Sequence, residues 1–503
     1  MNNKLFSRQS GVLMPIFSLP SKYGIGDFGK ESYLFIDLLK GANQKLWQIL
    51  PLVQTESGNS PYSTMCSDSF SPYYISPELL FEQGLITKEE LNLAFCNKTR
   101  IDYKLLKAVR YKLLERAFCR FDKQNQEFAE FVSTKQCLDY ALFMAIKETN
   151  SYKPFYEWEE GLKNAKASRL SQFLIEKKER VAFYQFLQFM ARSQWFDLKK
   201  YANKNGIQII GDLPLYVAHD STDVWKNNKL FKLDKNLLPT SVAGVPPDYF
   251  CESGQLWGNP VYDYLEHKKD NFSWWVSRLE KALKIYDIVR IDHFRALDRY
   301  YEIDANSKNA KAGKWIKVPS KELFEAINKK VDKNRIIAED LGIIDDGVKA
   351  LIKSLGYSGM KVLSFAFNGD KDNPYMPQNI NENSICYTGT HDNNTLRGFI
   401  KCLNNDERKT LINGVKNSLK ELDIDINIDD DLSIIRAIIM LGVKSKAKMF
   451  IVPMQDLLFL DSDYRINTPG VVKESNWSVK FNKDQICEDA FLEIKNFTKK
   501  YDR

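Results

Sequence analysis

The chain has 503 residues, of which 44% are hydrophobic and 27% charged, and this ordinary globular composition excludes a disordered, collagen-like or coiled-coil protein. The net charge of +7 is small for this length and the lysines are scattered, so we expect no nucleic-acid partner. The chain lacks the run of about 18 apolar residues that crosses a membrane. The apolar run at 11–17 contains Pro15 and no small-residue cleavage site, so neither a membrane partner nor a secretory signal is expected.

The cysteines and histidines predict a reduced protein. Eight cysteines show no C-x-x-C spacing and only four histidines accompany them, which argues against a zinc site. Single thiols inside apolar stretches, such as Cys137 and Cys386, are typical of reduced core residues. We therefore expect a cytoplasmic protein that uses no cofactor and no metal.

Short β-branched segments recur along the chain, and eight of them are predicted to be strands. They lie at 11–14, 45–50, 207–210, 288–291, 335–338, 360–363, 384–387 and 449–452. Helix-length amphipathic segments, for example 31–40, 272–283 and 321–331, separate most of them. Strands that alternate with helices predict a parallel sheet, and eight such strands favour an α/β fold of the closed (β/α)8 TIM-barrel type over an open sheet.

Two intervals do not fit this alternation. Residues 82–203, between the second and third strands, carry helical patterns at 103–121, 128–148 and 180–203. We expect a mainly helical insertion packed on the barrel, so that residues 1–503 form a single catalytic unit; a separate helical domain is the alternative. Residues 224–264 are rich in Gly, Pro, Asp and aromatic side chains without a clear period, and we expect a long irregular loop at the active site.

Acidic residues directly follow three of the predicted strands. These are Asp292 after the fourth strand, Glu339 after the fifth and Asp392 after the seventh; the third strand adds Asp212. Catalytic residues of a barrel lie at the carboxyl ends of its strands. One such acid is typical of a helix cap or a loop ion pair. Four acids that converge with the neighbouring Arg290, His293 and His391 instead predict a catalytic site.

The spacing of Arg290 and Asp292 suggests how the acids differ. Side chains alternate along a strand, so these two point to the same side, and Arg290 is expected to keep Asp292 ionised. A carboxyl group in a drier position would keep its proton. One carboxylate and one carboxylic acid are what retaining glycoside chemistry requires.

Other motifs carry less weight. The segment Gly24-Ile-Gly-Asp-Phe-Gly29 matches G-x-G-x-x-G, but Pro20 separates it from its strand and no acid ends the next strand to bind a ribose. Only His293 and His391 lie at strand ends, and neither has a partner at metal-ligand spacing. The sequence contains neither a G-x-S-x-G motif nor a P-loop.

Several segments together resemble the 4-α-glucanotransferases, also called amylomaltases or disproportionating enzymes, which form glycoside hydrolase family 77 of the α-amylase superfamily. The resemblance covers nearly the whole chain. Besides the three acidic motifs, it rests on Ser10-Gly-Val-Leu13, Ser18-Leu-Pro20, Tyr23-Gly-Ile-Gly-Asp27, Trp47-Gln-Ile-Leu-Pro-Leu52, Ser60-Pro-Tyr62, Gly211-Asp-Leu-Pro-Leu-Tyr-Val-Ala-His219, Asp223-Val-Trp225, Ala243-Gly-Val-Pro-Pro-Asp-Tyr-Phe250, Gly254-Gln-Leu-Trp-Gly-Asn-Pro260 and Asn467-Thr-Pro-Gly470. The segments 243–250 and 254–260 are specific to this family as opposed to amylases in general.

The resemblance implies a role for each matching residue. Asp292 matches the nucleophile that forms a covalent glucosyl-enzyme, Glu339 the general acid/base, and Asp392 the carboxylate that grips donor hydroxyls. The partners that orient these three carboxyl groups correspond to Arg290, His293 and His391. The residues of the donor subsite correspond to Tyr62 and Asp212. The loop expected to cover the cleft and seat the acceptor carries Asp248, Tyr249, Phe250, Gln255 and Trp257.

The implied reaction moves a segment of an α-1,4-glucan to the 4-hydroxyl of glucose or of another α-1,4-glucan. The partners are then maltooligosaccharides and other α-1,4-glucans, with glucose as an acceptor, and the chain is expected to be a monomer or homodimer. Transfer outcompetes hydrolysis if a closed aromatic cleft excludes water, and Trp225, Tyr249, Phe250 and Trp257 are expected to line it, with packing of the loop on the barrel as the alternative. An α-glucan hydrolase and a non-catalytic glycan-binding protein remain as alternative functions.

Overall fold

The structure is a computed structural model that describes residues 8–55, 57–96, 98–135, 137–247, 252–342 and 344–503. Eight parallel strands form one sheet in the order β10-β11-β12-β1-β2-β3-β6-β9. In chain order they are β1 (Gln9–Leu13), β2 (Leu46–Gln48), β3 (Gln208–Leu213), β6 (Ile288–Ile291), β9 (Ile336–Ala338), β10 (Gly359–Val362), β11 (Ser384–Tyr387) and β12 (Met449–Pro453). A parallel bridge between Ile337 and Ser358 joins the two outermost strands. The sheet therefore closes, and the predicted (β/α)8 barrel with its eight strands is confirmed.

The barrel interior changes from apolar to polar along the strands. A separate core cluster holds at least one side chain from each of the eight strands, among them Leu46, Ile210, Ile288 and Ile337. Side chains of a strand alternate, so the next inward position after Ile288 is Arg290, and the next after Ile210 is Asp212. The apolar layer thus forms a floor below a charged layer at the carboxyl ends.

Helices surround the barrel as the periodicity predicts. The expected segments 31–40, 272–283 and 321–331 are α1 (Lys30–Gly41), α12 (Ser273–Ile285) and α13 (Ser320–Asn328). The other helices outside the two insertions are α11 (Tyr264–Lys269), α14 (Asp346–Leu355), α15 (Leu396–Cys402), α16 (Asn405–Glu421), α17 (Asp431–Lys444), α18 (Met454–Leu457) and α19 (Leu492–Lys500). Among the described residues, no helix has both the length and the apolar character needed to span a bilayer.

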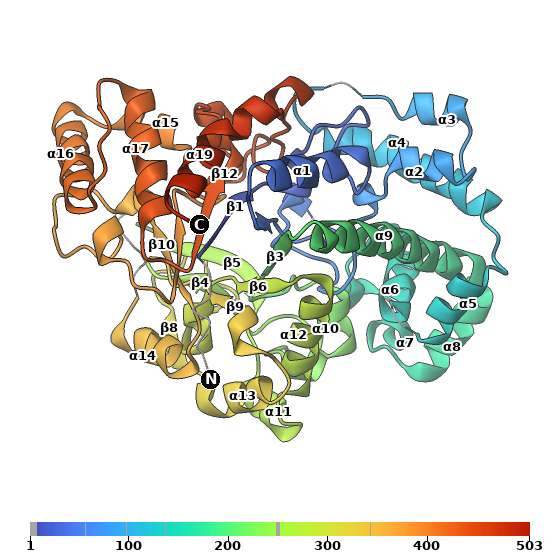
Figure 1. Ribbon diagram of the computed structural model, residues 1–503. Helices are drawn as coiled ribbons and strands as arrows, with labels where there is room; N and C mark the ends of the chain where they lie inside the picture. Colours follow the sequence, from blue (N-terminus) through green and yellow to red (C-terminus); the bar gives the residue numbers. More distant parts are fainter. Residues whose placement is uncertain (1–7, 56, 97, 136, 248–251, 343) are drawn as a thin grey trace, which may run out of the picture.

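The first insertion is helical and shares its core with the barrel. It follows α2 (Pro77–Glu82) and contains α3 (Lys88–Leu93), α4 (Tyr103–Arg120), α5 (Gln126–Ser133), α6 (Leu138–Thr149), α7 (Glu160–Lys163), α8 (Ala167–Glu176) and α9 (Lys178–Lys204), which lie opposite α15–α17 in Figure 1. On α9, Trp195 contacts Phe28 and donates a hydrogen bond to the carbonyl oxygen of Ile285 at 3.1 Å. Buried side chains of the insertion form one hydrophobic core with side chains on the outside of the barrel strands, such as Trp47 and Ile209.

One helical pattern in this insertion is broken. The pattern at 128–148 predicts one helix, but the structure has α5 and α6. Lys135 and Cys137 between them have φ angles of 54° and 62°, a left-handed conformation that ends a helix. Cys137 is consequently half-buried, whereas Cys386 is fully buried as expected, and all described cysteines are free thiols.

The second insertion is not an irregular loop, which corrects the prediction for 224–264. It begins within α10 (Thr222–Lys226) and contributes β4 (Ser241–Val245) and β5 (Gln255–Pro260). These pair with β7 (Arg299–Asp304) and β8 (Lys314–Lys317) in an antiparallel sheet of order β5-β4-β7-β8. The partner strands β7 and β8 come after the next barrel strand, so the pairing is non-local and leaves no local period in the sequence.

Candidate active site

A buried arginine connects the ends of two neighbouring barrel strands. Asp212 of β3 lies opposite Arg290 of β6 in the strand register. The Arg290 Nη1 atom donates to both carboxylate oxygens of Asp212 at 2.8 Å and to Oδ1 of Asp292 at 3.0 Å. Arg290 and Asp212 are buried, while the Asp292 side chain is 27% exposed. The expected orientation of Arg290 and Asp292 toward the same side is confirmed.

Tyr62, from the loop after β2, completes this cluster. Its hydroxyl donates to Oδ2 of Asp212 at 2.6 Å, and its ring stacks on His391 with centroids 5.2 Å apart. Trp477 contacts both rings and was not found by sequence reasoning, because no strand end or acidic motif marks it. Burial lowers the pKa of His391, so its ring is neutral at ordinary pH.

Asp392 lies at the rim of the same cluster. Its side chain is 41% exposed, and its Oδ2 atom is 3.3 Å from Nε2 of His391. Asn467 donates to its Oδ1 at 2.6 Å, and Arg465 donates to its backbone carbonyl at 2.6 Å. Sequence reasoning assigned no role to Asn467, although it noted the motif that contains it, and it missed Arg465.

Glu339 and Asp340 follow β9 but have different environments. Glu339 accepts hydrogen bonds from the backbone N–H groups of His293 at 2.6 Å and Leu341 at 3.1 Å. Asp340 accepts from the N–H of Met360 at 2.6 Å and lies 3.6 Å from the Lys361 ammonium. Glu339 therefore belongs to the site, whereas Asp340 fastens the backbone of β10 to β9.

The pKa values of the two central acids, Asp292 and Glu339, shift in the same direction. Burial raises the pKa of Glu339, as predicted for an acid that keeps its proton. Burial also raises the pKa of Asp292 well above its ordinary value, and Asp212, Glu339 and Asp392 add to that rise while Arg290 opposes it. Arg290 therefore opposes the rise without cancelling it, and the ionised state of Asp292 stays a prediction. Because the charge of Glu339 raises the pKa of Asp292, we expect the two acids to titrate as a pair that shares a proton.

The other side of the site is built from rings. His293 has a left-handed φ of 48°, and its ring and that of Trp257 lie nearly perpendicular with centroids 4.9 Å apart. Burial lowers the pKa of His293 to about 3, so it is neutral. Trp257 is 37% exposed, donates to Oε1 of Gln255 at 3.1 Å and contacts Tyr216. We call Tyr216, Gln255, Trp257 and His293 the aromatic half, and Tyr62, Asp212, Arg290, Asp292, His391 and Asp392 the charged half.

Not every residue expected at the cleft lies there. Trp225 is fully buried, packs against Phe143 and Trp158 of the helical insertion, and donates to the carbonyl of Leu162 at 2.8 Å. It belongs to the core, and its prediction as a cleft residue is wrong. The predicted residues Asp248, Tyr249 and Phe250 lie outside the described residues.

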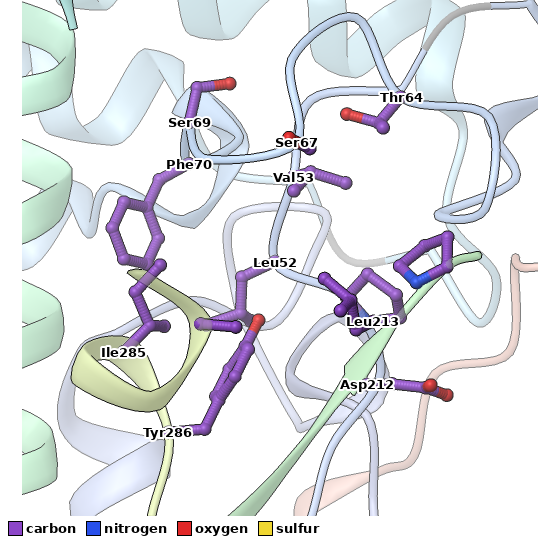
Figure 2. Close-up of a pocket in the computed structure, with 13 residues that line it drawn as sticks. Leu52, Val53, Thr64, Ser67, Ser69, Phe70, Asp212, Leu213, Ile285 and Tyr286 are labelled. Carbon is purple, nitrogen blue, oxygen red and sulfur yellow. The ribbon is translucent and has the colours of Figure 1, made fainter. Parts of the chain in front are cut away.

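A small cavity lies behind β3, and Figure 2 shows the side chains that line it, with the Asp212 carboxylate pointing away. Its volume of about 20 Å³ is too small for a sugar ring. It therefore belongs to the packing behind the charged half. The described residues contain no group of three His, Cys, Asp or Glu side chains arranged to hold a metal ion.

Comparisons with known proteins agree across the whole chain. Residues 14–485 match the sequence profile of a family described as 4-alpha-glucanotransferase. The 4-alpha-glucanotransferase of Clostridium butyricum is 41% identical over 497 residues, which cover 97% of this chain and 100% of the relative. That of Aquifex aeolicus (strain VF5) is 40% identical over 489 residues, with 96% and 98% covered. Among solved structures, amylomaltase from Streptococcus agalactiae in complex with acarbose superposes with a TM-score of 0.92 at 36% identity, with 99% of each chain covered.

Proposed function

This chain belongs to the 4-alpha-glucanotransferase family, and we propose that it moves a segment of an α-1,4-glucan to the 4-hydroxyl of glucose or of another α-1,4-glucan. The observation that carries the proposal is the meeting of Asp292 and Glu339 at one barrel mouth. The backbone N–H of His293, the residue after Asp292, donates to the Glu339 carboxylate at 2.6 Å, which brings the ends of β6 and β9 together.

The mechanism we propose is a retaining double displacement. An oxygen of Asp292 attacks the anomeric carbon, the glycosidic C–O bond breaks, and Glu339 gives its proton to the departing oxygen. Glu339, now a carboxylate, takes the proton from the 4-hydroxyl of the acceptor, whose oxygen then displaces Asp292 from the anomeric carbon. The two inversions retain the α-configuration and restore both acids. A retaining pair requires carboxyl groups separated by about 5–5.5 Å.

The surroundings support this division of roles. Asp292 has a cation, Arg290, within 3.0 Å, whereas the backbone N–H groups that donate to Glu339 are neutral. In the reactive form the shared proton is therefore on Glu339 and the negative charge on Asp292. The Asp392 carboxylate, fixed by Asn467 and partly exposed, is available to bind donor hydroxyls and stabilise the developing positive charge.

The remaining residues are proposed to bind the glucan. Tyr62, Asp212, Arg290 and His391 surround the donor sugar, and His293 separates it from the acceptor side. On the acceptor side we propose Gln255 and Trp257 together with Asp248, Tyr249 and Phe250. The exposed ring of Trp257 offers an apolar face on which a sugar packs and from which water is excluded.

Incubation with maltotriose tests the function. A transferase gives a ladder of longer maltooligosaccharides together with glucose, while the number of reducing ends stays constant. Reducing ends that rise continuously without longer products would identify a hydrolase. Absence of any product, with glucan binding intact, would identify a glycan-binding protein.

Asp292→Asn tests the mechanism. The amide cannot act as a nucleophile, so we expect turnover to fall by at least about 10⁴-fold while glucan affinity persists. Asp346→Asn is the matched control. The Asp346 carboxylate is fully exposed on α14, so this substitution removes the same charge from the surface instead of the site. A 5-fluoro glucosyl donor that traps the intermediate should label Asp292, as read by peptide mass spectrometry. A label on another residue would contradict the proposed nucleophile.

A further inference from the structure

A buried acid outside the proposed chemistry lies just behind the charged half. Asp456 belongs to α18, which directly follows barrel strand β12, and it is only 2% exposed. No cation of the described residues forms an ion pair with it. Burying an unpaired carboxyl group costs stability, and burial raises the pKa of Asp456 to about 6. An uncharged side chain that kept the hydrogen bonds of this position would avoid that cost.

The two oxygens of Asp456 bind the two ends of one loop. The Thr388 hydroxyl donates to Oδ2 at 2.7 Å, and the Leu396 backbone N–H donates to Oδ1 at 2.7 Å. Thr388 is the first residue after β11, and Leu396 begins α15. The residues between them, 389–395, include His391 and Asp392. We call residues 388–396 the catalytic loop.

The interior of the catalytic loop is held by its own hydrogen bonds and by Asn467 and Arg465, which donate to Asp392. The N–H and the hydroxyl of Thr390 both donate to Oδ1 of Asn393, at 2.8 and 2.9 Å, and the Asp392 N–H donates to the Thr390 hydroxyl at 3.3 Å. A small cavity lies beneath the loop, between Thr390, His391, Asp456 and Arg465. The position of the loop therefore depends on how its ends at Thr388 and Leu396 are fixed, together with the bonds that Asn467 and Arg465 make to Asp392.

We propose that Asp456 is a positioning residue for glucan transfer, because its carboxyl group joins Thr388 to Leu396 and thereby places His391 and Asp392 against the donor sugar. This inference rests on the proposed function. Asp456 touches no reacting atom and acts through Asp392. A displacement of a catalytic group by about 1 Å costs on the order of 10²-fold in rate, so the loss of this link should be visible mainly in kcat.

Four variants test the inference, each assayed on maltotriose well below its measured melting temperature. Asp456→Ala removes both hydrogen bonds, and we expect kcat to fall roughly 10- to 100-fold while KM changes less than about 3-fold. Asp456→Asn keeps an acceptor for the Leu396 N–H and a donor for the Thr388 oxygen, and its kcat should stay within about 3-fold of wild type. Thr388→Val removes only the hydrogen bond to Oδ2 of Asp456 with little change of shape, and its kcat should lie between those of Asp456→Ala and Asp456→Asn. Asp463→Asn, an exposed acid nearby, should leave kcat unchanged.

A double variant separates positioning from a general loss of stability. If Asp456 acts through Asp392, adding Asp456→Ala to Asp392→Asn should lower the residual rate on an activated glucosyl donor by less than about 3-fold. Amide hydrogen exchange in the catalytic loop should also be faster in Asp456→Ala. Should that variant not fold, Thr388→Val carries the same comparison.

The outcomes that overturn the inference are distinct from failure of the proposed function. A wild-type protein without transfer products would refute the function itself. An active wild type with Asp456→Ala or Thr388→Val at wild-type kcat would refute the positioning role. A full additional loss in the Asp392→Asn background would show that Asp456 acts elsewhere, and a loss in Asp456→Asn as large as in the alanine variant would show that charge, not the link, matters.

Discussion

The two halves of the active site are held in different ways. In the charged half, strand register places Arg290 beside Asp212, and one guanidinium nitrogen lies within 3.0 Å of three carboxylate oxygens. In the aromatic half, Trp257 comes from β5, an outer strand of the antiparallel sheet, and meets His293 through ring contact. Ion pairs on barrel strands are directional, so they fix the position of groups that take part in bond formation. Ring contacts at a sheet edge are less directional, so they allow the surface that binds the sugar to adjust.

The largest effect should come from breaking the ion pairs of the charged half. Arg290→Met leaves the buried Asp212 carboxylate without a cation, and we expect the free energy of unfolding in urea to fall by about 3–5 kcal/mol. The double variant Asp212→Asn/Arg290→Met removes both charges and should recover more than half of that loss. Both variants should be inactive, because Asp292 loses its cation.

Arg299→Met is the matched control for this comparison. Arg299 pairs with Asp298 at 3.1 Å, but its side chain is 38% exposed, so its loss should cost less than about 1 kcal/mol. If Arg290→Met were no more destabilising than Arg299→Met, the stability of the charged half would not depend on its ion pairs.

The charged half could largely be predicted from the sequence, because its signals are local. Short β-branched segments that end in Asp or Glu mark the barrel strands, and alternation along a strand correctly places Arg290 and Asp292 on the same side. The pairing of Arg290 with Asp212 depends on the register between β3 and β6, which no local pattern contains. Asp456 also follows a barrel strand closely, but Met454 and Gln455 separate it from the end of β12, so the rule of an acid directly after a strand did not select it.

The aromatic half could not be predicted in the same way. Trp225 and Trp257 both lie in the segment 224–264, yet one is buried against Phe143 and Trp158 and the other is exposed beside His293. Only the position of the helical insertion distinguishes them, and that is a tertiary property. The antiparallel sheet was missed for a similar reason, because β4 finds its partner β7 only after the chain has passed through β6.

A smaller effect concerns His293, the neutral histidine of the aromatic half. We expect it to change the free energy of unfolding by about 2 kcal/mol as the pH falls. Burial lowers the pKa of His293 to about 3, below the value of 6.5 in the unfolded chain. The unfolded state therefore binds an extra proton as the pH falls through 6.5, and the stabilising contribution of His293 is lost progressively below that pH. Between pH 7.5 and pH 5, wild type should lose about 2 kcal/mol more unfolding free energy than His293→Asn.

Asparagine suits this comparison because it tolerates the left-handed backbone of His293 and does not titrate. Any constant difference in stability between the two proteins cancels when each is compared with itself at two pH values. Identical pH dependence of wild type and His293→Asn in urea unfolding would show that the ring is accessible to protons, and the aromatic half would then be wetter than its contacts indicate.

The smallest effect should be on how the glucosyl-enzyme divides between reaction with water and reaction with a sugar acceptor, and not on the rate of donor cleavage. Trp257→Ala removes the exposed wall of the aromatic half and leaves the charged half intact, so water should capture the glucosyl-enzyme more often. We expect the ratio of hydrolysis to transfer on maltotriose to rise about 10-fold, which corresponds to about 1.4 kcal/mol, with kcat for donor cleavage nearly unchanged. Leu256→Ala is the matched control. Leu256 is similarly exposed and lies next to Trp257 on β5, where it pairs with Gly244. Because side chains alternate along a strand, Leu256 points to the opposite face of the sheet. An unchanged ratio in Trp257→Ala, or an equal rise in Leu256→Ala, would mean that the aromatic half does not shield the intermediate and that the discrimination against water resides in the charged half.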